Sequence, residues 1–272
     1  MDRRKQILWL LVIVTAAGLA VPAAHAEELK ALRVCADPDN LPFSNRQGEG
    51  LENRIAALVA EALEIPLVYT WWPQRRGFLR GTLNARRCDV VIGIPTGHPM
   101  VLTTGTYYSS PYVVVSRRQD GLQIASLDDP FLKGLRIGVY QNSPVDFVLG
   151  RRGMVHNVTG YSTFYDGRIN YPGKIIEDVT SGRIDVAILW GPAAGYFVAQ
   201  QSDTLKLVPI EVPRLEGNGE GEAEVFAMSM GVRKTDAPLQ AALNAVIKAK
   251  KDEIKSILQH YEVPLEVQAS GP

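Results

Sequence analysis

The sequence predicts an α/β protein of two lobes, each built on a doubly wound sheet, joined by a hinge that the chain crosses twice. One strand-like segment, Leu-Arg-Val-Cys-Ala at 32–36, is followed about a hundred residues later by Leu-Arg-Ile-Gly-Val at 135–139. A short helical stretch that runs into an apolar strand also occurs twice, at 84–92 and 180–188. A period of this length exceeds any solenoid unit and fits two small domains, each with its own core. Two similar lobes enclose a cleft, and clefts bind ligands.

The first 26 residues have the features of an export signal. A basic stretch at 3–5 precedes an apolar run at 7–20, and the small-x-small sequence Ala-His-Ala follows at 24–26. The apolar run is short for a membrane span, and no cysteine follows the cleavage site. The alternative is a retained N-terminal anchor. We expect cleavage after Ala26, a periplasmic location and no membrane span in the mature chain.

The charge balance argues against a nucleic-acid partner. Without the signal, 246 of the 272 residues remain, with 26 basic and 28 acidic side chains. A protein that binds nucleic acid needs an excess of basic residues to neutralise phosphates. This chain has none.

Cys35 and Cys88 are the two cysteines. In an oxidising compartment an even pair indicates a disulfide. Cys35 lies in the first predicted strand and Cys88 leads into the third, and these strands are neighbours in a doubly wound sheet. We therefore predict a Cys35–Cys88 bond, and no metal or redox role for the pair.

The first lobe is predicted to comprise residues 27–114 and 225–272. Its elements begin with an apolar strand and alternate between helices and strands. They are a strand at 32–36, a polar loop at 37–49, helix 51–64, strand 67–72, helix 77–87, strand 89–94, a crossing strand at 108–116, a returning strand at 225–232 and a long helix near 238–260.

The second lobe is predicted to comprise residues 115–212 and to repeat this plan. An exposed loop rich in glycine and glutamate follows at 213–224, since it has no apolar period. The two crossings place the hinge near 113–118 and 207–214. The elements of this lobe are a strand at 135–140, a helix after Ser143, a helix at 172–181, a strand at 184–190 and a helix at 192–201.

Three segments carry a resemblance to a known family. They read Cys-Ala-Asp-Pro-Asp-Asn-Leu-Pro-Phe-Ser-Asn at 35–45, Trp-Trp-Pro-Gln-Arg-Arg-Gly-Phe at 71–78 and Trp-Gly-Pro-Ala-Ala-Gly-Tyr-Phe at 190–197. With the two-lobed plan and the returning strand, the whole mature chain resembles periplasmic solute-binding proteins of ABC importers, which have the type II periplasmic binding protein fold. Within that group it resembles the J-type branch associated with quinoprotein alcohol dehydrogenases of methanol-oxidation clusters.

The resemblance implies an accessory role. A protein of this branch is an activation or assembly partner of a PQQ-dependent alcohol (methanol) dehydrogenase, and the dehydrogenase's c-type cytochrome is a further candidate partner. The alternative is the solute-binding component of an ABC importer for an apolar or planar organic solute. A third hypothesis, an enzyme on this scaffold, has only Asp37 as a candidate general acid or base. We predict that the chain is not an enzyme.

The chain departs from the amino-acid binders of the same group. Their carboxylate-binding arginine follows the third strand, where this sequence reads Thr-Gly-His-Pro-Met at 96–100. Their ammonium-binding aspartate corresponds to Trp190, and the glycine-led acidic segment of the first helix is altered at 50–54. A zwitterion without its counter-charges in a dry cleft costs several kcal/mol. We expect no binding of free amino acids.

The predicted cleft combines aromatic walls with few polar groups, which suits an apolar or planar organic ligand. The alternative is that Trp72, Phe78 and Trp190 are ordinary core residues. The predicted lining residues are Asp37, Asn40, Leu41, Phe43, Trp72, Gln74, Arg75, Arg76, Phe78, Thr96, Ser143, Trp190 and Gly191.

Two adjacent arginines, Arg75 and Arg76, precede a predicted helix, where the helix dipole disfavours positive charge. With Arg80 one turn later, they indicate an anionic target in the cleft or on a partner. The alternative is pairing with surface carboxylates. Pyrroloquinoline quinone (PQQ) is planar and polyanionic and would suit arginines and tryptophans; this assignment is a conjecture.

Asp89 and Asp185 occupy matching places in the two lobes, each at the start of an apolar strand. We expect structural roles for both rather than paired catalysis. The sequence has no nucleophile elbow, glycine-rich phosphate loop or metal-ligand motif.

Overall fold

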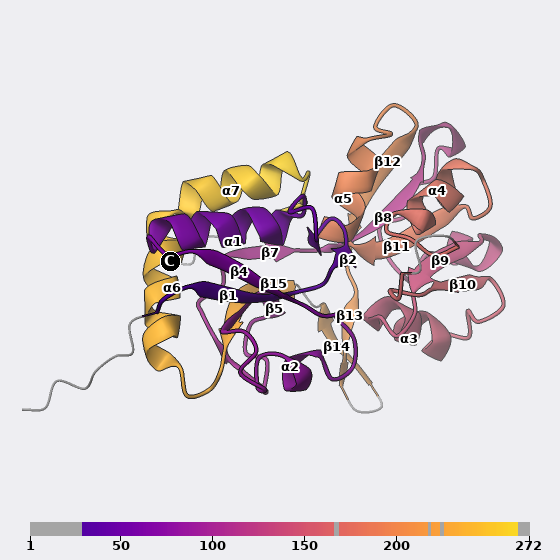
Figure 1. Cartoon of the computed structure of the whole chain (residues 1–272). Helices are drawn as coiled ribbons and strands as arrows, with labels where there is room; N and C mark the ends of the chain where they lie inside the picture. Colours follow the sequence, from indigo (N-terminus) through magenta and orange to yellow (C-terminus); the bar gives the residue numbers. More distant parts are fainter. Residues whose placement is uncertain (1–28, 166–168, 217–218, 224–225, 266–272) are drawn as a thin grey trace, which may run out of the picture.

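Two sheets form the framework of the protein (Figure 1). The computed structural model describes residues 29–165, 169–216, 219–223 and 226–265, so the predicted export signal at 1–26 lies outside the described residues. The first sheet has the strand order β4-β1-β5-β15-β6, with β7 also paired to β15, and the second has the order β10-β9-β11-β8-β12. The predicted two-lobed α/β class is confirmed.

The strands of the first sheet are β1 (Leu32–Ala36), β4 (Leu67–Trp71), β5 (Val90–Pro95), β6 (Leu102–Thr103), β7 (Tyr108–Ser110) and β15 (Phe226–Val232). Those of the second are β8 (Tyr112–Arg117), β9 (Ile137–Tyr140), β10 (Val158–Tyr161), β11 (Val186–Trp190) and β12 (Leu205–Ile210). Two short pairs complete the strands: β2 (Asp39–Asn40) with β3 (Ser44–Asn45), and β13 (Pro213–Glu216) with β14 (Gly219–Ala223).

Helices cover both faces of each sheet. On the first sheet, α1 (Leu51–Ala62), α6 (Ala237–Ala249) and α7 (Lys251–His260) pack on one face, and α2 (Phe78–Gly81) lies on the other (Figure 1). On the second, α3 (Pro144–Arg151) and η2 (Pro130–Gly134) cover one face, while α4 (Lys174–Thr180) and α5 (Gly191–Ala199) cover the other. The turn η1 (Arg118–Asp120) follows β8. Each sheet therefore has a core on both faces, which is why β5 and β11 are continuous apolar runs.

The crossing between the sheets is sharper than predicted. The segment expected to be one strand at 108–116 divides at Pro111 into β7, which pairs with β15, and β8, which pairs with β11 and β12. Proline has no N–H to donate to a ladder, so the strand changes sheet there. Residues 112–117, expected near the hinge, therefore belong to the second sheet, as does β12.

Three element predictions were wrong in detail. The helix expected at 77–87 is a single turn, because it begins after Gly77, whose φ is 93°, and ends at Thr82, whose φ of −119° and ψ of −81° are not helical. The long helix at 238–260 is broken at Lys250, between α6 and α7. The loop expected at 213–224 contains the antiparallel hairpin β13–β14, with Leu215 opposite Glu220. An antiparallel hairpin is defined by its backbone hydrogen bonds, so the missing apolar period did not exclude strands here.

The predicted disulfide is present. Cys35 and Cys88 are bonded with their Cα atoms 5.5 Å apart, because β1 pairs directly with β5. Both belong to the small apolar cluster under α2, together with Phe78, Val91 and Ile94. Among the helices of the described ranges, none has the length and apolar character needed to cross a membrane.

Candidate functional site

An aromatic stack joins the two lobes. Phe43, from the segment between β1 and α1, lies on the ring of Trp190 at the end of β11, with centroids 5.6 Å apart and planes 9° from parallel. Tyr108 of β7 stacks on the same indole at 6.2 Å, and Phe226 of β15 meets it edge-on at 6.4 Å. We call these four residues the aromatic junction. It brings together side chains from both sheets at the place where the sequence predicted the ligand cleft.

The start of α1 holds Phe43 in position. The backbone N–H groups of Leu51 and Glu52 donate to the carbonyls of Pro42 and Phe43, each at 2.8 Å. A side chain at Gly50 would collide with the Phe43 carbonyl, so only glycine allows this approach. The first amides of a helix have no partner within the helix, and here the 42–43 segment supplies one.

Trp190 is fixed from the opposite side. Its indole N–H donates to the Ser110 carbonyl at 3.0 Å, next to the point where the chain changes sheet. Gly191 follows as the first residue of α5, and a Cβ there would lie 2.6 Å from the Ser110 hydroxyl and 2.9 Å from the Pro111 carbonyl. Two of the three lining residues predicted in the second lobe, Trp190 and Gly191, therefore lie against the first crossing.

Asp37 organises the loop at the carboxyl end of β1. Its carboxylate accepts the N–H of Asp39 at 2.9 Å and that of Gln74. The Asn40 amide donates to the Gln74 side chain at 3.4 Å. These bonds join the first two predicted cleft loops, while Leu41 is half-buried beside them.

Three other predicted lining residues make contacts within one lobe. The Thr96 hydroxyl lies 2.6 Å from the Ser229 hydroxyl and 2.9 Å from that of Thr106. Ser143 caps α3, accepting the Asp146 N–H at 3.3 Å. Trp72 packs against the apolar cluster under α2.

A buried carboxyl group lies beside this site. Glu52, in the first turn of α1, is 8 % exposed, and its carboxyl group lies directly against the backbone of Gly93, where a side chain would collide with it. Burial, reinforced by the negative charge of Asp37, raises the pKa of Glu52 to about 8. None of the described residues donates a hydrogen bond to this carboxyl group. Glu52 is therefore mostly protonated at neutral pH.

The surroundings of Glu52 are also unusually polar for a core. Tyr107 donates to the Ile92 carbonyl at 3.0 Å, whereas the buried hydroxyl of Tyr108 has no hydrogen-bond partner among the described residues. Burial, and to a smaller extent Glu52, raises the pKa of Tyr108 well above its ordinary value. The sequence contains the signal for this group, because Glu52 shares a helical face with Ile55, Ala56 and Val59.

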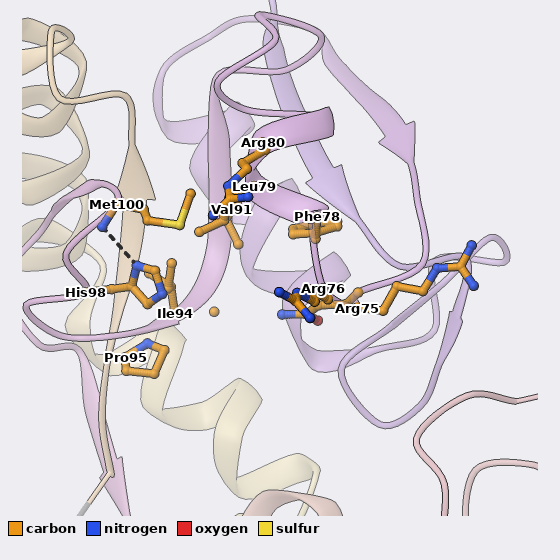
Figure 2. Close-up of a pocket in the computed structure, with 13 residues that line it drawn as sticks. Arg75, Arg76, Phe78, Leu79, Arg80, Val91, Ile94, Pro95, His98 and Met100 are labelled. Carbon is orange, nitrogen blue, oxygen red and sulfur yellow. Dashed lines mark hydrogen bonds between the residues drawn. The ribbon is translucent and has the colours of Figure 1, made fainter. Parts of the chain in front are cut away.

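A cavity of about 430 Å³ opens between the α2 loop and the end of β5 (Figure 2). Four of the predicted lining residues contribute to it: Gln74, Arg75, Arg76 and Phe78. The sequence did not indicate the others as a group. They are Gly77, Leu79, Arg80, Val91, Gly93, Ile94, Pro95, His98 and Met100.

The predicted structural aspartates form ion pairs at the far ends of the strands. Asp89 accepts from Arg33 at 2.6 Å and from Arg233 at 2.7 Å. Burial raises the pKa of Asp89, but the two arginines outweigh it and hold the pKa below its usual value. Arg136 binds Asp185 at 2.6 Å and lowers the pKa of that carboxyl to about 2. In the part of the chain that the structure describes, no cluster of three or more His, Cys, Asp and Glu side chains could hold a metal ion.

Comparison with known proteins gives one consistent group. No family profile matches the chain. Protein MoxJ of Methylorubrum extorquens is 33 % identical over 244 residues, which cover 86 % of this chain and 81 % of the relative. Protein MoxJ of Paracoccus denitrificans is 28 % identical over 260 residues, covering 92 % and 94 %.

Two solved structures have the same architecture. The crystal structure of MxaJ from Methlophaga aminisulfidivorans MPT superposes with a TM-score of 0.75 at 29 % identity, covering 87 % of this chain and all of the other. That of the periplasmic binding protein XoxJ from Methylobacterium extorquens AM1 gives 0.70 at 37 % identity, covering 88 % of this chain and all of the other.

Proposed function

Because the chain belongs to the MoxJ, MxaJ and XoxJ family of periplasmic binding proteins, we propose that it is an accessory partner of a PQQ-dependent alcohol (methanol) dehydrogenase, acting in its activation or assembly. The resemblance to this family supports the identity of the partner, and the geometry of the site supports the mode of action. On this view the protein presents a fixed surface to the dehydrogenase and does not carry amino acids.

The aromatic junction is the observation that supports this proposal. A solute-binding protein needs free space between its lobes, and here Phe43 and Trp190 lie against each other in that position. Stacked aromatic pairs contribute about 0.5–1.5 kcal/mol beyond the burial of their surface. A solute entering between the rings would have to replace that contact, so the stack favours a closed arrangement of the lobes.

The polar groups agree with this interpretation. Thr96 is hydrogen-bonded within its own lobe, and no arginine follows it at 97–100. Glu52, a buried acid in the first turn of α1 with a pKa of about 8, is mostly protonated at neutral pH and offers little charge to an ammonium group. A free amino acid would lose its hydration without gaining counter-charges, which is unfavourable.

The test is native mass spectrometry of the mature protein, mixed with the quinoprotein dehydrogenase purified from the same periplasm and separately with its c-type cytochrome. An amino-acid-binding protein of the same fold serves as the negative control. A stoichiometric complex with the dehydrogenase, absent from the control, is the expected result. Failure to form it at concentrations of tens of micromolar would refute the accessory role.

One observation favours a second candidate, the solute-binding component of an importer for an apolar or planar organic solute. The cavity beside α2 combines an apolar floor with arginines. A retained small molecule without a dehydrogenase complex, in the same spectra, would favour this candidate.

A further inference from the structure

The α2 cavity carries an unbalanced positive charge. Three arginines, Arg75, Arg76 and Arg80, and one histidine line it, and its lining contains no acidic residue. No ion pair joins any of these arginines to a carboxylate elsewhere in the described ranges. The described residues therefore do not support the alternative, in which these arginines pair with surface carboxylates.

The floor of the cavity is apolar and rigid. Phe78, Val91 and Ile94 are each at least nine-tenths buried in the cluster that also contains the disulfide. Because these side chains are packed from below and a disulfide links β1 to Cys88, just before β5, the floor exists before any ligand arrives. A flat apolar surface beneath cationic groups suits an amphipathic molecule rather than a bare inorganic ion.

The polar edge of the cavity is oriented as well. The N–H of Met100 donates to Nδ1 of His98 at 3.3 Å, which leaves Nε2 of a neutral ring as the hydrogen-bond donor (Figure 2). The guanidinium of Arg75 lies 5.2 Å from the ring centre of Phe164, which follows β10 in the second lobe. Among the described residues, Arg76 and Arg80 have no comparable ring or ion-pair contact, so their guanidinium groups are available to an anion.

We infer that this cavity binds a small planar organic polycarboxylate, with its carboxylates on Arg76, Arg80 and His98 and its flat body on Phe78 and Ile94. Guanidinium groups bind carboxylates through paired, charge-assisted hydrogen bonds. A volume of about 430 Å³ lies within the usual range of small-molecule sites. An acidic protein segment shares the charge but does not need an apolar floor. The inference does not depend on docking to a dehydrogenase.

The test is isothermal titration calorimetry of the mature protein with two planar tricarboxylates, benzene-1,3,5-tricarboxylate and PQQ. The trimethyl ester of the first is the uncharged control, and a hexaglutamate peptide represents an acidic protein segment. The double variant Arg76→Gln/Arg80→Gln removes the two available cations. Lys251→Gln/Lys255→Gln on α7 makes the same change in net charge at exposed positions of another face.

The expected result is one molecule of tricarboxylate per protein, with affinity falling about tenfold or more in the arginine variant, as the loss of a charge-assisted hydrogen bond predicts. Affinity should stay within about twofold in the lysine variant, since α7 does not line the cavity. Met100→Gln, which changes the apolar wall, should also weaken the tricarboxylate.

Three outcomes would overturn the inference. Equal losses in both double variants would mean general charge attraction. Equally tight binding of the ester would mean that the arginines are not the anchors. Tight binding of hexaglutamate with no binding of either tricarboxylate would identify the cavity as a contact for an acidic protein segment.

Discussion

Replacing Glu52 by glutamine should remove a specific pH dependence from the stability of the protein. The folded state holds this carboxyl with a pKa of about 8, against 4.5 for the free side chain. Between these values the folded protein binds a proton that the unfolded chain has released. Stability therefore falls as the pH rises through this window, and becomes independent of Glu52 above it.

The magnitude follows from the two pKa values. Between about pH 5.5 and about pH 8 the contribution of Glu52 to the free energy of unfolding should fall by about 3 kcal/mol, at 1.36 kcal/mol per pKa unit. Glutamine fills nearly the same space against Gly93 but does not ionise. The difference in stability between Glu52→Gln and the wild type should accordingly change in favour of the variant by about 3 kcal/mol over this range.

The assay is urea denaturation at several pH values, analysed by linear extrapolation. Glu61→Gln is the matched control, because Glu61 is exposed on the same helix. Its stability should follow the wild type at every pH. If the difference between Glu52→Gln and the wild type stays constant with pH, the carboxyl group ionises normally in the folded protein and the reasoning about its burial is wrong.

The remaining predictions concern the framework of the site. Asp89→Asn should cost about 3 kcal/mol, because a nearly buried carboxylate leaves two arginines without their counter-charge, whereas Asp185→Asn should cost about 1 kcal/mol at a more exposed pair. Since both carboxyl pKa values are lowered, these contributions exist above about pH 4 and disappear as the pH falls further. Replacing Cys35 and Cys88 by serine opens a loop with a sequence separation of 53 and should cost about 4 kcal/mol. Trp190→Phe, which lacks the indole N–H, should lose about 1 kcal/mol.

Each of these has a clear contradicting result in denaturation experiments. Equal losses in the two aspartate variants would mean that burial does not distinguish the two ion pairs. A melting temperature unchanged by reduction would mean that the disulfide does not constrain the unfolded chain. For the tryptophan variant, an unchanged stability would show that solvent replaces the lost hydrogen bond at the junction.

The architecture could be predicted from the sequence because it depends on patterns that repeat. The paired segments at 32–36 and 135–139 became β1 and part of β9, and the cysteine spacing gave the bond between adjacent strands. The details that were missed depend on local backbone conformation. Nothing in the apolar period of 77–87 indicates that Thr82 leaves the helical conformation, which ends the helix after one turn.

Predictions about the site were limited by a different factor. Residue type identified Phe43 and Trp190 as neighbours of the cleft but could not distinguish contact with a ligand from contact with each other, because the same aromatic surface serves both. That choice depends on how α1 positions the 42–43 segment. The Gly50 contact with the Phe43 carbonyl, which sets this position, is a tertiary feature without a periodic signal.

In a solute-binding protein, the ligand site and the contact between the lobes are normally the same place. In this protein they are separate: the lobes meet at the aromatic junction, and the candidate ligand site is the α2 cavity. In a solute-binding protein the ligand lies between the lobes, so binding and lobe closure are one event. Here aromatic rings from the protein itself join the lobes, and the cationic cavity is lined by other residues, all from the first lobe. Arg75, which lines the cavity, contacts Phe164 of the second lobe. A ligand in the cavity would therefore shift the equilibrium between two lobe arrangements only to the extent that it binds one of them more tightly than the other. Such a difference in affinity would act through Arg75, because this residue contacts the second lobe.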